Sequence, residues 1–154
     1  MKNRDVIILA NAGILNTTYH TLDGEHAYKM FKFRKELQKA INAYTEAYKE
    51  LLNDAGIEDG QNFEGRIEQL QKNNEPTKEE KAELDELLAK KSKFEEMVNS
   101  LLNEDVSIDC KTMPFSEYHK LWSENHPKEG RPVSVFEFDE VIDMLEGVLW
   151  HPDE

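Results

Sequence analysis

Five histidines and one cysteine are the side chains of this chain that could bind a metal ion. A zinc site uses ligands at short, regular spacing, such as two cysteines or two histidines a few residues apart, and no such pair occurs here. His119 and His126 are seven residues apart and could share a helix face, but Pro127 ends that helix directly afterwards. We therefore expect no metal and no cofactor. The histidines are His20, His26, His119, His126 and His151.

The single cysteine, Cys110, lies on the apolar side of an alternating segment at residues 106–111. A buried cysteine usually packs as a small hydrophobic side chain, so we do not expect it to act as a nucleophile. A chain with one cysteine forms no internal disulfide, which is typical of a protein from a reducing cytoplasm. No glycine-rich phosphate loop and no nucleophile elbow occurs either. The sequence therefore predicts that the protein is not an enzyme.

Carboxylates outnumber basic side chains by 32 to 19, which gives a net charge of −13. Asp139, Glu140, Asp143 and Glu146 follow helical spacing and could form one acidic helix face. A solvated surface explains this pattern better than a divalent-cation or hydrolase site. If the face instead binds a protein, then Asp139, Glu140 and Asp143, together with the aromatic Trp150, are the candidate interface.

The charge also bears on nucleic acids, because a net −13 repels phosphate. Basic side chains concentrate at residues 29–39, where Phe31 and Phe33 stand between them, and this stripe could touch a nucleic-acid backbone. Direct binding of DNA or RNA is nevertheless disfavoured. The acidity permits the opposite relation, in which carboxylates on a rigid helical surface mimic DNA and occupy a basic groove of another protein.

Two long helical patterns must position these side chains. Apolar residues recur every three or four positions over residues 25–55 and again over 77–105, and Ala27, Phe31 and Leu52 widen the first stripe. The stripes face each other across a polar break, so we predict a long antiparallel, coiled-coil-like hairpin. Lysines early in the first helix would then meet glutamates late in the second.

The break at residues 56–76 contains a short amphipathic piece, which predicts a helix near 62–72 between two loops, with a small β-hairpin as the alternative. Thr77 and Glu80 form a capping box that starts the second long helix, and Gly56 suits the end of the first. The N-terminal segment at 3–18 could be a strand or a helix. We prefer a helix, with Asn3 as its N-cap.

After the second long helix, the alternation at residues 106–111 predicts a strand that pairs with the tail of the chain or with another chain. Ser116 can cap a helix that runs to about residue 125, and a second capping box at 134–137 starts a final helix that reaches Leu149. The predicted fold is therefore mainly α in one domain, 1–154. The hairpin spans 25–105, and segments 1–24 and 106–154 form a small base with an N-terminal helix, one short strand and two C-terminal helices.

Several short segments resemble small phage- and prophage-encoded proteins of unknown function. They are Lys2-Asn3-Arg4-Asp5-Val6-Ile7, Ala27-Tyr28-Lys29-Met30, Leu101-Leu102-Asn103-Glu104-Asp105-Val106-Ser107-Ile108 and Met113-Pro114-Phe115-Ser116. The chain departs from that pattern at residues 120–133, which are longer, and at Trp150-His151-Pro152. The resemblance implies a phage context and a helical hairpin, and it transfers no catalytic residue.

Two functions follow from these observations. The first is a phage or prophage structural or assembly module that binds a phage or host protein, or itself, through helical surfaces. The second is an acidic accessory inhibitor that binds a basic host protein as a DNA mimic. No apolar run approaches the ~20 residues of a membrane span, so we expect no membrane partner. The bacterial cytoplasm is the expected location, with the virion as the alternative.

Overall fold

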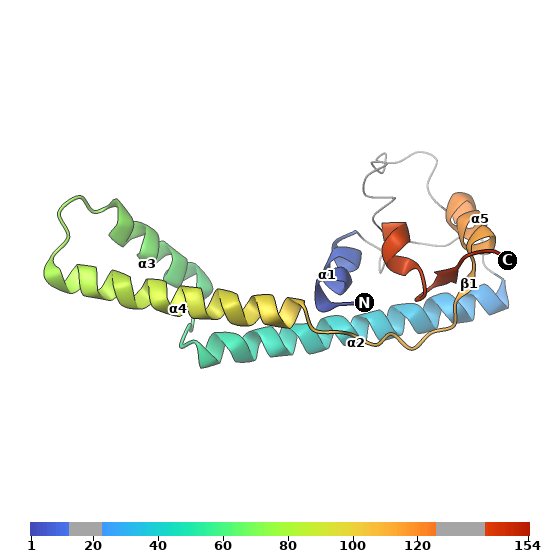
Figure 1. Cartoon of the computed structure of the whole chain (residues 1–154), viewed down its shortest axis with the longest axis horizontal. Coiled ribbons are helices and arrows are strands. Elements are labelled where there is room, and N and C mark those ends of the chain that lie inside the picture. The colour runs from blue at the N-terminus through green and yellow to red at the C-terminus, as the bar shows by residue number, and fades with distance from the viewer. Residues whose placement is uncertain (13–22, 126–140) are drawn as a thin grey trace. The chain divides into compact units, whose positions relative to one another are not determined.

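A computed structural model describes residues 1–12, 23–125 and 141–154, and it confirms a mainly α protein with one small parallel sheet (Figure 1). A further helical stretch covers residues 141–145. The labelled elements are α1 (Asn3–Asn11), α2 (Gly24–Asp54), α3 (Gly60–Lys72), α4 (Lys78–Leu102), β1 (Met113–Pro114), α5 (Phe115–Asn125) and β2 (Trp150–His151).

The chain forms two compact units, and the boundary between them falls inside α2. Unit 1 consists of Met1–Ala43 and Glu104–Glu154, and unit 2 consists of Tyr44–Asn103. The first half of α2 thus belongs with the segments that the sequence assigned to the base. The assignment of residues 1–154 to one domain stays a prediction.

The core of unit 1 is built around one side of α2. Met30, Phe33 and Leu37 are buried because their spacing of three and four residues places them on one helix face. They pack in one cluster with side chains from α1, β1, α5 and the C-terminal segment. These further buried residues are Val6, Leu9, Met113, Tyr118, Leu121, Leu145, Leu149 and Trp150.

The N-terminal segment is helical over α1, as predicted, and residues 13–18 of that prediction lie outside the described part. Lys2 and not Asn3 is the N-cap, and the Lys2 backbone N–H donates to Asp5 Oδ2 at 2.8 Å. Backbone hydrogen bonds attach this end to the chain that follows α4. Asn3 N–H donates to the Glu104 carbonyl at 3.1 Å, and Val106 N–H donates to the Met1 carbonyl at 2.8 Å.

The strand predicted at residues 106–111 is wrong in its position. Val106, Ile108 and Cys110 do pack on the core while the residues between them are exposed, so the alternation of burial is as expected. An extended segment lying on a core needs that alternation whether or not it joins a sheet. The ladder forms at β1, which pairs in parallel with β2 and places Met113 beside Trp150. The tail is therefore the pairing partner.

The two C-terminal helices differ from the prediction at their ends. α5 forms, but Ser116 lies inside it and is not the cap. Its backbone N–H and its hydroxyl donate to Asp153 Oδ1 at 3.1 and 3.0 Å, so a carboxylate from the tail satisfies the helix start. The capping box at 134–137 lies outside the described residues. The final helix stops at Leu145 and does not reach Leu149, because Gly147 at φ +75° begins a turn.

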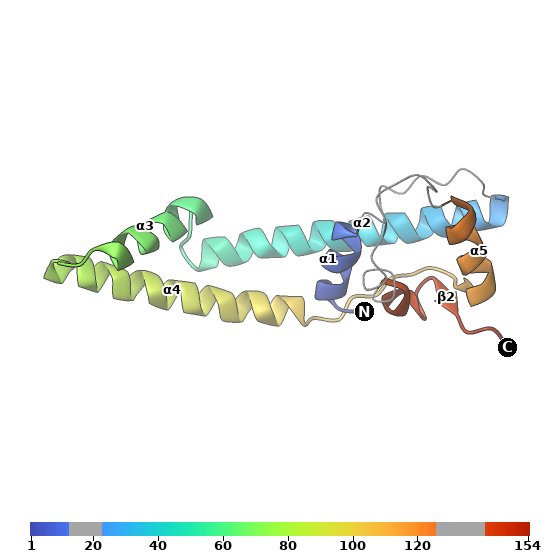
Figure 2. The ribbon, with the colours of Figure 1, turned by 90° about the horizontal axis from the view of Figure 1, so that it is seen from above.

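In unit 2, the short helix expected in the polar break is present as α3, so the β-hairpin alternative is wrong. Asp59 caps α3, and Thr77 caps α4 by accepting the Glu80 backbone N–H at 3.1 Å, as its capping box predicts. α3 lies along the first half of α4 (Figure 2). A forked pair of hydrogen bonds from Arg66 to Glu83, 2.7 and 2.8 Å long, joins the two helices.

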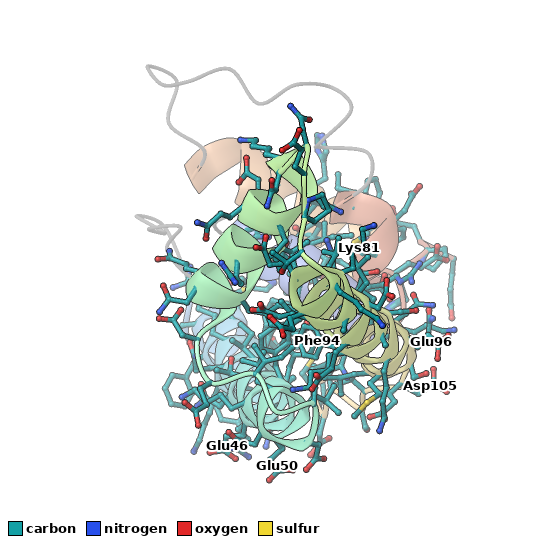
Figure 3. The ribbon with its side chains drawn as sticks, turned by 90° about the vertical axis from the view of Figure 1, so that its left-hand side faces the viewer. Glu46, Glu50, Lys81, Phe94, Glu96 and Asp105 are labelled. Atoms are coloured by element: carbon teal, nitrogen blue, oxygen red, sulfur yellow. The ribbon has the colours of Figure 1, made fainter. Side chains whose placement is uncertain are left out.

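The end of α2 runs antiparallel to α4. The Tyr48 ring meets the Phe94 ring edge-on at a centroid distance of 5.5 Å, and the Lys90 ammonium lies beside Gly56, which follows α2. Residue numbers therefore increase along α2 in the direction in which they decrease along α4. Phe94 lies between these two helices, whereas Glu46 and Glu50 point outwards from α2 (Figure 3). Gly56 at φ +72° ends α2 near Lys90. α4 therefore contacts α3 along its first half and α2 near its second half.

Truncation of Phe33 should destabilise the protein, whereas truncation of Phe31, two residues earlier on α2, should have little effect. Phe33→Ala should lower the free energy of unfolding by about 3–5 kcal/mol, because it leaves a cavity in the core of unit 1. Phe31→Ala should change it by less than about 0.5 kcal/mol, because that ring is exposed. Urea unfolding followed by circular dichroism measures both, and equal losses would contradict the orientation of α2.

The ring contact of unit 2 can be tested by a double-mutant cycle. Tyr48→Ala and Phe94→Ala should show a coupling free energy of about 0.5–1.5 kcal/mol, the value of a packed aromatic pair. A cycle of Lys49→Ala with Phe94→Ala is the control, since Lys49 is exposed on the same helix. Coupling no larger than in the control would argue against the antiparallel register.

Candidate interaction surface

The structure describes two of the four predicted interface residues, Asp143 and Trp150. Asp139 and Glu140 lie outside the described residues, and Asp143 is exposed on the helical stretch at 141–145. Trp150 is a core residue with 8% exposure, and an interface formed by Asp139, Glu140, Asp143 and Trp150 stays a prediction. Its indole N–H donates to the Ile142 carbonyl at 2.9 Å, and its ring packs on Phe115 at a centroid distance of 4.7 Å. Pairing of β2 with β1 over the core directs this side chain inwards.

Among the side chains that the structure describes, the clearly exposed aromatic rings lie on α2. Tyr28 is 66% exposed and Phe31 is 63% exposed, on the side of α2 opposite to Met30 and Phe33. The prediction that Phe31 widens the apolar stripe of α2 is therefore wrong. At 100° per residue Phe31 falls about 160° away from Phe33, so both cannot face the same core. Periodicity centred on Phe33 could have shown this.

Three lysines share the exposed side of α2 with the two rings. Lys32, Lys35 and Lys39 follow Tyr28 and Phe31 at helical spacings of three and four residues, so all five side chains lie on one face. Lys35 is exposed, and the side chains of Lys32 and Lys39 are 36% and 65% exposed. We call these five residues the aromatic–lysine surface.

Among the residues that the structure describes, three lysines of α2 form ion pairs with carboxylates that lie outside α4. The ion pairs are Lys29 with Glu25 at 3.3 Å, Lys32 with Asp109 at 3.8 Å, and Lys39 with Glu36 at 2.9 Å. The hydrogen bond from Lys39 is the main reason that the pKa of Glu36 is lowered. The Lys32–Asp109 pair, whose side chains are 36% and 88% exposed, contributes only about 0–1 kcal/mol, so a partner's carboxylate can replace Asp109 there.

A second cluster joins the start of α2 to α5. Asp23 caps α2 by accepting the His26 backbone N–H at 2.9 Å, and its other oxygen lies 2.7 Å from His26 Nδ1. Glu117 Oε2 lies 3.1 Å from His26 Nε2. Only the imidazolium can donate from both ring nitrogens, so the cluster favours protonated His26. The pKa of His26 is raised, first by the hydrogen bond to Glu117, which is 91 residues away and could not be identified from local spacing.

Cys110 behaves as a small, partly buried side chain that packs against the core. Its thiol donates to the Val148 carbonyl at 2.6 Å, and burial raises the pKa of the thiol, which disfavours the nucleophilic thiolate. Across residues 1–12, 23–125 and 141–154, no group of three His, Cys, Asp or Glu side chains converges as a metal-ligand set. Among these same residues, no helix has the length and apolar content needed to cross a membrane.

The His26 cluster should make stability depend on pH. Because the folded pKa of His26 is raised, its stabilisation is complete below the ordinary histidine pKa and is lost as pH rises through the folded value. Unfolding at ~pH 5.5 and ~pH 8 should show this loss in the wild type and a smaller loss in His26→Gln. An NMR titration of His26 should move to lower pH in Glu117→Gln. An unchanged titration in that variant would contradict the contact with α5.

No family model, no curated protein and no solved structure matches this chain. Its function must therefore be inferred from its own exposed side chains.

Proposed function

We propose that the protein is a non-enzymatic binding module that recognises another protein through the aromatic–lysine surface. The exposure of Tyr28 and Phe31 carries this proposal. Within the described part of the chain, they and Leu88 are the large hydrophobic side chains that are clearly exposed, and Leu88 is only 37% exposed. Exposed rings that lie together on one helix face are typical of a protein-binding site.

The energetics favour a partner for these rings. An aromatic side chain buries about 150–250 Å² on full burial. At ~25 cal/mol per Å², covering both rings could contribute several kcal/mol to binding. Such anchors account for most of the affinity of many interfaces, whereas scattered polar contacts around them mainly exclude water. Tyr28 and Phe31 are therefore the residues that we expect to dominate binding.

The shape of the surface supports binding rather than catalysis. Its five residues lie along one side of a single helix, and a helix side is convex. Catalytic sites are usually concave and surround their substrate. The raised pKa of the Cys110 thiol also fits a structural role for that residue. These features support a module that works by contact with a protein.

A phage or prophage setting is part of the proposal, and it rests on the resemblance of several short segments to such proteins. In that setting the module would serve particle structure or assembly, in the host cytoplasm or in the virion. The neighbouring genes provide a direct test. Head or tail genes beside this one would support the assembly role, whereas early genes would favour an inhibitor.

The inhibitor is the second candidate, and one observation favours it. Unit 2 carries fifteen Asp/Glu and eight Lys/Arg, and Glu46 and Glu50 point outwards from α2 one helical turn apart (Figure 3). Carboxylates at such spacing on a helix could occupy the basic groove of a host protein. This mode of binding would depend on unit 2 and would not require Tyr28 or Phe31.

Cross-linking distinguishes these candidates. A photoreactive residue at Gln38, which is exposed on the same side of α2 as the aromatic–lysine surface, should capture a partner in lysate of cells that carry the gene. Tyr28→Ala/Phe31→Ala should weaken binding of the purified partner by about tenfold or more, because two interface anchors are lost. Leu88→Ala is the matched control and should bind as the wild type does.

The outcomes separate cleanly once circular dichroism has shown that the variants are folded. A partner that binds the double alanine variant normally but is lost with Glu46→Lys/Glu50→Lys would favour the inhibitor. A partner that binds all of these variants equally would contradict both candidates.

A further inference from the structure

Aromatic and basic side chains lie at different ends of the aromatic–lysine surface. The two rings stand at its N-terminal end, and the lysines follow over the next turns of α2. From Tyr28 to Lys39 the helix rises about 16 Å, at 1.5 Å per residue. This length matches about three turns of a partner helix or a short extended peptide. The surface therefore separates an apolar contact from a cationic one along a single axis.

The charge of this region is opposite to that of the chain as a whole. Residues 28–39 contain five Lys/Arg and one Glu, a net +4, in a chain of −13. An acidic partner would thus be attracted here and repelled by most of the remaining surface. Such a pattern gives orientation and specificity even where each exposed ion pair is weak.

A nucleic acid fits this surface less well than a protein does. A duplex carries a negative charge about every 1.7 Å along its whole length, so most of its phosphates would lie beyond the three lysines. Unit 1 as a whole contains eleven Lys/Arg and seventeen Asp/Glu. A short protein segment meets less repulsion from this acidic excess, because its carboxylates can be confined to the positions of the lysines while its apolar side chains cover the rings.

From this arrangement we infer that the partner presents an acidic amphipathic segment, with apolar side chains on the two rings and carboxylates on the three lysines. The inference rests on the proposed function and adds the chemistry of the partner to it. In the complex, one carboxylate of the segment replaces Asp109 as the neighbour of Lys32, and others lie beside the exposed ammonium groups of Lys35 and Lys39. The rings provide most of the affinity, and the lysines set the orientation of the segment.

A displayed library of random linear peptides, selected on the full chain, provides the probe. The peptides that bind should be acidic and should contain apolar residues at one end. A synthetic, fluorescently labelled copy of the best peptide should bind Lys35→Glu/Lys39→Glu about tenfold more weakly than the wild type, and rising salt should reduce the difference. Lys49→Glu/Lys93→Glu changes the net charge equally at two exposed lysines of unit 2 and should bind the peptide normally.

The variants separate the inference from the proposed function. Peptide binding that is lost in Tyr28→Ala/Phe31→Ala but unchanged in Lys35→Glu/Lys39→Glu would overturn the acidic partner and leave the protein-binding function in place. Peptides that bind the alanine variant normally, or a failure to select any peptide, would overturn the inference. The function would then be decided separately by the partner captured from lysate.

Two further measurements test the alternative occupants of the surface, which are a nucleic acid and a second copy of the chain. A single-stranded or duplex DNA oligonucleotide that binds the wild type more tightly than the selected peptide does would overturn the inference in favour of a nucleic acid. Light scattering that shows a stable dimer, dissociated by Tyr28→Ala/Phe31→Ala and not by the peptide, would identify a second copy of the chain as the occupant. A monomer that binds the peptide and neither oligonucleotide is the expected result.

Discussion

Burial of one side of α2 in unit 1 is the constraint on which the remaining features depend. Met30, Phe33 and Leu37 occupy the core with almost no exposure, and this fixes the rotation of the helix about its axis. Once that rotation is set, the opposite side must face outwards. It carries Tyr28 and Phe31, so the same contact that stabilises unit 1 also creates the proposed binding surface.

The core of unit 1 is completed by segments from both ends of the sequence. α1 is attached by backbone hydrogen bonds to the chain after α4, and β2 pairs with β1 beside α5. Asp153 satisfies the start of α5, and Glu117 on that helix reaches His26 at the start of α2. Each of these contacts joins residues far apart in the sequence. A rigid base of this kind holds the exposed side of α2 in place, which lowers the entropy cost of binding.

Basic and acidic side chains are concentrated in different parts of the chain, which suits the recognition of a charged partner. The basic segment of α2 stands out within an acidic chain, whereas the acidic excess of unit 2 favours solubility and offers an alternative surface. We prefer the surface that carries the aromatic rings as the binding site, because apolar burial contributes more to affinity than exposed ion pairs do. The lysines then act on orientation and on the rate of encounter.

Local sequence determined the helices, because spacing and capping act within a few residues. The stripes of α2 and α4, the cap at Thr77 and the left-handed Gly56 were all predictable in this way. Tertiary structure alone decided where the ladder forms, that Trp150 is buried and that Glu117 meets His26. Alternation at residues 106–111 marks an extended segment on a core but contains no information about its hydrogen-bond partner. The burial of Trp150 was decided in the same way, since it depends on what the rest of the chain places against the side chain, whereas the exposure of Phe31 follows from its position on α2 opposite to Phe33.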